Sequence, residues 1–124
     1  IVLQLTYAKL KEGLFFMPSK EICQFCDQIR TIINGKRLVG LPTYGAIEVH
    51  IKEFSPEPLY IEVKNGNVSI EPYEYNNKDA TITLDIQTLH DIYNRKISIN
   101  DALNRKLILI DGDAEVLYCL QRNI

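Results

Sequence analysis

The sequence predicts one α+β domain in which helices pack on one side of a mostly antiparallel sheet. Segments in which apolar and polar residues alternate, as they do in half-buried strands, occupy the middle of the 124-residue chain. Segments with apolar residues three and four positions apart, as in amphipathic helices, lie on both sides of them. Asn65-Gly66 separates two of the alternating segments, and this pair is the strongest short-range indication of a β-hairpin.

A first helix is expected over residues 20–34, because Ser19 can cap its start and Asn34-Gly35 stops its apolar pattern. Its apolar stripe contains Ile22, Phe25, Cys26, Ile29, Ile32 and Ile33. Residues 1–18 fit a strand and a helix equally well, so they are treated as an uncertain N-terminal segment, either a linker or a lid. The domain itself is expected over residues 19–124.

Strands and further helices are expected in the rest of the chain. Alternation predicts strands over residues 47–51, 59–64, 68–70 and 80–84. Asp85 and Asp113 can each cap a helix, and residues 100–103 suggest a short helical turn. The two capped stripes are Ile86, Leu89, Ile92 and Tyr93, and then Val116, Leu117 and Leu120. Residues 107–110 show no polar alternation, which predicts a strand covered on both faces or resting against a partner.

Composition argues against several classes of function. The chain is 46% hydrophobic and 24% charged, close to the globular average, and its net charge of −2 offers no basis for binding nucleic acid. No apolar run approaches the ~20 residues of a membrane-spanning helix, and the start lacks the features of a signal peptide. A cytoplasmic protein without an integral membrane segment is therefore expected. Because the chain begins at Ile1 rather than at methionine, it is interpreted as either a trimmed chain or one domain of a longer protein.

Residues 80–113 resemble, without a gap, the C-terminal half of the sterol carrier protein type 2 family. The features that carry the resemblance are the strand Thr81-Ile82-Thr83-Leu84, the short helix around Asp101-Ala102-Leu103 and a strand ending at Gly112-Asp113. The resemblance continues more loosely upstream through the hairpin. It implies a five-stranded sheet backed by helices, with an apolar tunnel between them that holds fatty acids, acyl-CoA or sterols.

Four positions depart from the pattern of that family. Arg95 and Lys106 stand where the family usually has glycine. Leu107 and Leu109 stand where its last strand usually has a basic residue facing solvent. The departures favour a last strand that is buried or contacts another subunit. They also mean that the resemblance predicts the fold of this chain better than it predicts the ligand.

Cys23 and Cys26 form a C-x-x-C motif, which suits a redox pair or half of a zinc site. However, Cys23 lies about a turn inside the predicted helix, and no other Cys or His is placed at paired spacing with it. Reduced thiols that pack as small apolar residues are the preferred interpretation, and His50 and His90 are expected at the surface. No motif of a nucleophilic enzyme occurs, so no catalytic residue, metal or cofactor is expected.

The best-supported function is the non-catalytic binding or transfer of a lipid or fatty acyl ligand in a tunnel between sheet and helices. Its apolar wall is expected to contain Phe25, Ile29, Ile33, Val49, Ile51, Leu89, Tyr93, Leu117 and Leu120. The same residues would also suit a filled core. One alternative is an appended interaction domain with no ligand of its own, which forms a homodimer or contacts a neighbouring domain. The other is a thiol or metal module built on Cys23 and Cys26.

Overall fold

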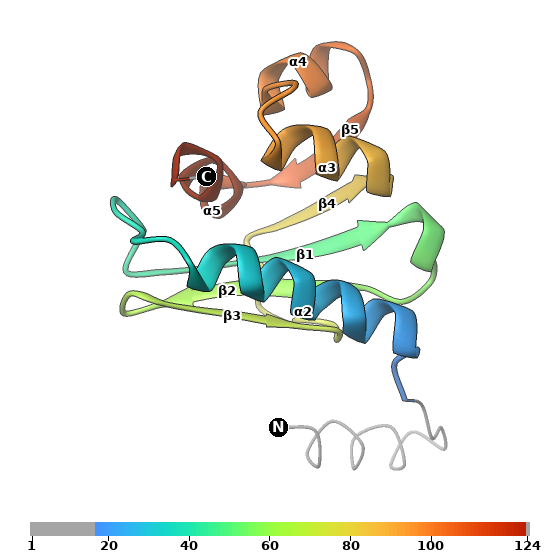
Figure 1. Ribbon diagram of the computed structural model, residues 1–124, viewed down its shortest axis with the longest axis horizontal. Coiled ribbons are helices and arrows are strands. Elements are labelled where there is room, and N and C mark those ends of the chain that lie inside the picture. Colours follow the sequence, from blue (N-terminus) through green and yellow to red (C-terminus); the bar gives the residue numbers. More distant parts are fainter. Residues whose placement is uncertain (1–16, 124) are drawn as a thin grey trace.

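The computed structural model describes residues 17–123, which form a five-stranded sheet covered by helices (Figure 1). In chain order the elements are α2 (Lys20–Asn34), β1 (Tyr44–Ile51), the 3-10 helix η1 (Lys52–Phe54), β2 (Leu59–Lys64), β3 (Asn67–Glu71), β4 (Ala80–Leu84), α3 (Ile86–Tyr93), α4 (Ile99–Asn104), β5 (Ile108–Gly112) and α5 (Glu115–Asn123). Most of the uncertain N-terminal segment, residues 1–16, lies outside the described residues, so its role as a linker or a lid stays a prediction.

The strands lie in the order β3-β2-β1-β4-β5. Neighbouring strands are antiparallel except for β1 and β4, which are parallel, so the expectation of a mostly antiparallel sheet is confirmed. The predicted hairpin joins β2 and β3, and both of its turn residues, Asn65 and Gly66, have positive φ. This is the backbone conformation that a two-residue turn with Asn-Gly requires.

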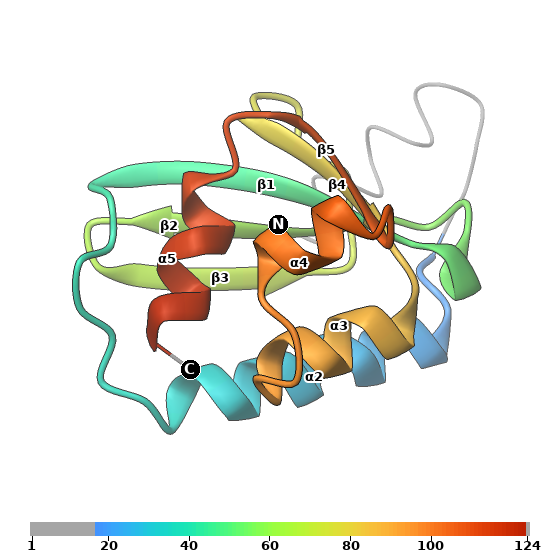
Figure 2. The same ribbon diagram turned by 90° about the horizontal axis from the view of Figure 1, so that it is seen from above.

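One face of the sheet is apolar and carries the core. Ile47 and Val49 of β1 pair with Ile61 and Leu59 of β2, and on the other side Val49 pairs with Ile82 of β4. All of these side chains are buried. Figures 1 and 2 show the helices on one side of the sheet, as the sequence predicted. Because alternate residues of a strand point to opposite faces, the polar residues between them lie on the other face.

Side-chain caps fix where the helices begin. The Asp85 carboxylate accepts a hydrogen bond from the Thr88 backbone N–H at 2.7 Å, and Ser19 Oγ accepts from Ile22 N–H at 3.4 Å. The Asp113 carboxylate accepts from Glu115 N–H at 3.0 Å, as expected for a cap of α5. Ser98 caps α4 in the same way, although the sequence analysis did not single it out.

Helices α3 and α4 both end in a residue with left-handed backbone geometry. Arg95 has φ 61° and Lys106 has φ 57°, and these are the positions where glycine was expected from the family resemblance. After α4, Lys106 N–H donates to Leu103 O and Leu107 N–H donates to Ala102 O, which is the hydrogen-bond pattern of a Schellman motif. A side chain in this conformation is strained, because its Cβ crowds the following carbonyl.

Replacing Lys106 with glycine is therefore expected to stabilise the protein by about 0.5–1 kcal/mol, since the strain removed exceeds the added entropy of the unfolded chain. Arg105→Gly is the matched control, because it removes a neighbouring positive charge at φ −89°, where glycine has no advantage. The control should destabilise by about the same amount. Urea unfolding measures both changes, and shifts of the same sign would show that the left-handed geometry is not the cause.

Of the two interpretations of the last strand, cover on both faces is wrong for the part of the chain that the structure describes, and contact with a partner stays a prediction. β5 lies at the edge of the sheet, and the Leu109 side chain is 65% exposed. Ile108 faces the core and is buried, and Ile110 is half-buried on the same face. The unbroken apolar run therefore combines a core-facing set with an apolar residue on the outer face.

The outer face of the sheet contains a buried carboxylate, Glu48 of β1, which is only 6% exposed. It accepts a hydrogen bond from Tyr75 N–H at 3.0 Å and lies 2.7 Å from His50 Nε2 and 3.4 Å from Lys78 Nζ. Burial by itself would raise the pKa of Glu48, but these partners together hold the pKa below its ordinary value. His50 thus lies on the polar face, as expected.

Glu48→Gln should lower the free energy of unfolding at pH 7 by about 1–3 kcal/mol, since a charged buried acceptor is lost. The pKa is lowered on folding, so the charged form stabilises the protein above the ordinary value of 4.5. That contribution disappears as the pH falls through the lowered pKa, and the two proteins should converge there. The control Glu115→Gln removes an exposed ion pair with Arg122 and should change stability much less at pH 7.

Candidate functional site

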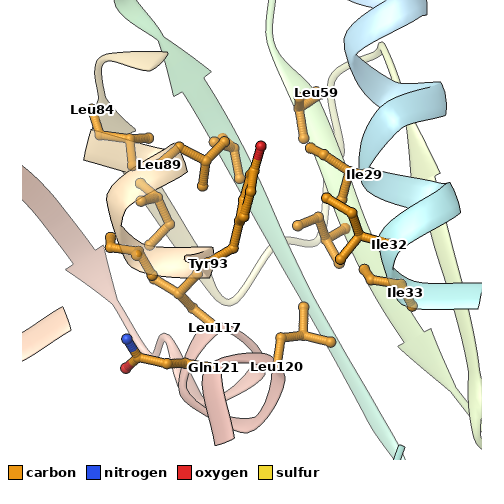
Figure 3. A pocket seen from close by; sticks show the side chains of 14 residues that line it. Ile29, Ile32, Ile33, Leu59, Leu84, Leu89, Tyr93, Leu117, Leu120 and Gln121 are labelled. Atoms are coloured by element: carbon orange, nitrogen blue, oxygen red, sulfur yellow. The ribbon is translucent and has the colours of Figure 1, made fainter. Parts of the chain in front are cut away.

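The candidate site is an apolar pocket enclosed by α2, α3 and α5 on the apolar face of the sheet (Figure 3). Its floor comes from β1, β2 and β4. Successive side chains of a strand point to opposite faces of the sheet, so every second side chain of these strands points toward the helices. The lining residues are Ile29, Ile32, Ile33, Val49, Leu59, Ile61, Ile82, Leu84, Leu89, Ile92, Tyr93, Leu117, Leu120 and Gln121.

The lining divides into a buried floor and a half-buried rim. Strand residues such as Val49, Leu59 and Ile82 are buried and form the floor. The rim contains the half-buried side chains Ile29 and Ile32 of α2, Leu89 and Tyr93 of α3, and Gln121 of α5. Figure 3 shows Ile29 and Tyr93 pointing toward one another from opposite helices. The pocket therefore opens where the helices face each other.

No charged side chain of residues 17–123 lines the pocket. Gln121 uses its Oε1 atom to accept a hydrogen bond from Ile99 N–H at 3.4 Å, so part of its polar group is already engaged outside the pocket. The other polar side chain, Tyr93, lies beside the His90 ring at a centroid distance of 5.2 Å. The walls thus offer hydrocarbon contact and no ionic group, which suits the apolar part of a ligand.

The closed cavity is small. Its volume is about 60 Å³, although the space between the lining side chains, counted out to the open mouth, is about 690 Å³. Pockets that hold a small ligand usually measure ~300–1,000 Å³. The half-buried side chains at the rim therefore leave little free room between the open mouth and the buried floor.

The structure brings together seven of the nine residues predicted for the wall. These are Ile29, Ile33, Val49, Leu89, Tyr93, Leu117 and Leu120. Phe25 and Ile51 are buried but lie elsewhere. Phe25 packs edge-on against Phe54 at 5.5 Å and stacks with His90 at 6.3 Å, and His90, like His50, is partly exposed. A role of the seven in ligand binding stays a prediction.

Sequence reasoning missed half of the lining. The missed residues are Ile32, Leu59, Ile61, Ile82, Leu84, Ile92 and Gln121. Most of them belong to the predicted apolar stripes and strands, so the periodicity indicated that they are buried. It did not indicate which of the buried residues line the pocket. Gln121 had no such signal, because its aliphatic stem joins the wall while its amide turns away (Figure 3).

The C-x-x-C motif lies on α2 apart from the pocket lining. Cys26 is fully buried and Cys23 is half-buried, and both are free thiols. Burial raises the pKa of both, to about 12 for Cys26. A redox cysteine needs a lowered pKa, so the environment opposes thiol chemistry. Within residues 17–123 no group of three or more His, Cys, Asp or Glu side chains is placed to hold a metal ion.

Native Cys26 should therefore resist alkylation. With a pKa of about 12 instead of 9.0, its thiolate fraction at pH 8 is roughly a thousandfold smaller than that of a free cysteine. Iodoacetamide labelling followed by mass spectrometry should modify Cys26 only after unfolding in urea, while the half-buried Cys23 serves as an internal comparison. Fast labelling of Cys26 in the folded protein would revive the thiol hypothesis.

The arrangement of a five-stranded mixed sheet with an apolar pocket under its helices is matched by a known family. The model of the SCP-2 sterol transfer family matches residues 41–122, so the chain belongs to this family. Membership indicates lipid binding or transfer as the class of function, and domains of this kind are generally non-catalytic. No curated protein is matched by the chain.

Solved structures share this fold at low sequence identity. UbiJ-SCP2, described as a ubiquinone synthesis protein, is 15% identical with a TM-score of 0.66, and the match covers 80% of this chain and 91% of that one. Palmitated SCP2L2 from Aedes aegypti is 23% identical with a TM-score of 0.52, covering 86% and 93%. The sec-alkylsulfatase Pisa1 from Pseudomonas sp. is 19% identical with a TM-score of 0.61, covering 68% of this chain.

This chain corresponds to only 13% of the length of the alkylsulfatase, so the similarity concerns one part of that enzyme. At these identities the likeness shows the fold alone. Among the described residues, no helix has the length and apolar character needed to cross a membrane.

Proposed function

We propose that this protein binds the apolar chain of a lipid in the pocket between α2, α3 and α5, without catalysing a reaction. The observation that carries the proposal is a hydrocarbon lining, contributed by three helices and three strands, in which the described part of the chain places no charged side chain. The polar end of such a ligand stays near the half-buried rim, where it remains in contact with water.

The structural relatives support a ligand with a long apolar chain. SCP2L2 from Aedes aegypti was solved in a palmitated form, and UbiJ-SCP2 is a protein of ubiquinone synthesis. Palmitate carries an acyl chain and ubiquinone carries an isoprenoid chain, so both present the hydrocarbon that this pocket can cover. Fatty acids and isoprenoid quinones are therefore the first ligands to test.

The energetics of chain burial are sufficient for binding. Each methylene group that leaves water contributes about 0.8 kcal/mol, so twelve carbons contribute on the order of 9 kcal/mol before the costs of association. Since the cavity is about 60 Å³, the ligand has to displace rim side chains and enlarge the site. Ile29 and Leu89 are half-buried at the rim and come from different helices, so they are among the side chains that a ligand would displace.

Binding is tested with protein that has been unfolded, stripped of lipid and refolded. Calorimetry with palmitate and with a short-chain ubiquinone should show saturable binding with a negative change in heat capacity, the sign of apolar burial. Native mass spectrometry of the protein as first purified should detect a bound lipid. An absence of saturable binding for both ligand types, together with an empty purified protein, would contradict the proposal.

Leu89→Gln tests the location of the site, because it places an amide at the rim. The dissociation constant for a bound chain should rise about tenfold, which corresponds to 1.4 kcal/mol. Leu103→Gln is the matched control, since Leu103 is also a half-buried helical leucine but does not line the pocket. Unfolding experiments should show similar stability losses for both variants. Equal effects of the two substitutions on binding would place the ligand elsewhere.

A further inference from the structure

The two edges of the sheet are protected to different degrees. At the outer edge of β3, the Arg30 guanidinium donates hydrogen bonds to the Ile70 carbonyl and, at 2.8 Å, to Glu71 Oε1. β3 also carries the polar residues Asn67, Ser69 and Glu71. Edge strands of β-sheets are normally protected from pairing with other strands by such charges, by proline or by a bulge.

As far as residues 17–123 are concerned, β5 has none of these guards over its apolar part. Residues 108–110 contain no charge and no proline, and the register with β4 runs from Ile108 to Gly112 without a bulge. Leu109 is 65% exposed on the outer face. An unguarded apolar edge of this kind is suited to pairing with another strand.

The backbone groups that point outward from β5 can be identified from the pairing with β4. Asp113 N–H donates to Asp79 O at 3.0 Å, just beyond the last pair of the ladder. Backbone groups alternate along an antiparallel strand, so Leu109 and Asp111 also direct theirs toward β4. Ile108, Ile110 and Gly112 therefore direct their N–H and C=O groups away from the sheet.

The charges around β5 complement each other when two copies run antiparallel. Arg105 and Lys106 precede the strand, whereas Asp111 and Asp113 lie at its end. Within residues 17–123, Arg105, Lys106 and Asp111 take part in no salt bridge. An antiparallel second copy brings the basic start of one strand beside the acidic end of the other, while a parallel copy aligns like charges.

We propose that β5 pairs antiparallel with β5 of a second copy of this chain, so that two sheets join across a two-fold axis at Leu109. In this register Ile108 lies opposite Ile110 of the other copy, and both present outward backbone groups to each other. The two Leu109 side chains meet on the outer face. The contact is isologous, as in most homodimers. None of its residues lines the lipid pocket, so the proposal is independent of ligand binding.

A pairing of two short strands buries little surface, so the dimer is expected to be weak and concentration-dependent. Sedimentation velocity of the full chain should show a rising dimer fraction with concentration. Leu109→Lys places like charges opposite each other and should raise the dissociation constant at least about tenfold. Val39→Lys is the matched control, because Val39 is 66% exposed and lies outside the strands. The dimer dissociation constant of this variant should equal that of the unchanged protein.

A charge exchange tests the antiparallel direction. Arg105→Asp and Asp111→Arg should each weaken the dimer, and the double variant should restore most of the loss because it recreates opposite charges across the axis. If the loss in dimerisation free energy of the double variant equals the sum of the two single losses, the proposed register is wrong.

Two further outcomes would overturn the proposal. The first is a chain that stays monomeric up to about 1 mM, where even a dissociation constant in the low millimolar range would be detected. The second is slow amide hydrogen exchange at Ile108 and Ile110 at concentrations so low that the chain is monomeric, which would show that the chain covers the edge itself. Equal weakening by Leu109→Lys and Val39→Lys would also count against pairing through β5.

Discussion

The apolar face of the central strands is the constraint on which the rest of the structure depends. β1 and β4 run parallel in the middle of the sheet, and Val49 and Ile82 lie side by side on the face that needs cover. Helices α2, α3 and α5 provide this cover. Their side chains meet over the floor from different directions, and the pocket lies where they meet (Figure 3). The pocket is thus a consequence of how the helices cover the core.

Local patterns predicted the elements well because each rests on a short-range rule. The alternation around Asn65-Gly66 gave the hairpin, and Ser19 and Asp85 marked helix starts that the structure places at the same residues. β1 begins at Tyr44 rather than at residue 47, because its first residues pair with β2 without contributing to the apolar alternation. The pairing of strands distant in the sequence leaves no comparable local signal.

The site was harder to predict than the fold. Periodicity identifies which side chains are buried, but Phe25 and Ile33 belong to the same stripe and only Ile33 lines the pocket. The two side chains differ in their neighbours, because Phe25 packs against the rings of Phe54 and His90 instead of facing the pocket. Such neighbours depend on how helices cross the sheet. For the same reason, the apolar run at the last strand indicated burial although the strand forms an edge.

The polar contacts of α2 have a consequence for how a guest could enter. Its first residues are tied to the chain before β2, because Glu57 accepts hydrogen bonds from Ser19 N–H at 3.0 Å and from Ser19 Oγ at 2.7 Å. Further along the helix, Arg30 clamps it to β3. On α3, by contrast, the polar ties to other elements are at the start, where Glu53 accepts from Ile86 N–H at 3.0 Å. Among the described residues, the end of α3 that bears Tyr93 is held to other elements by side-chain packing alone, so it is the part of the pocket wall whose displacement breaks the fewest hydrogen bonds.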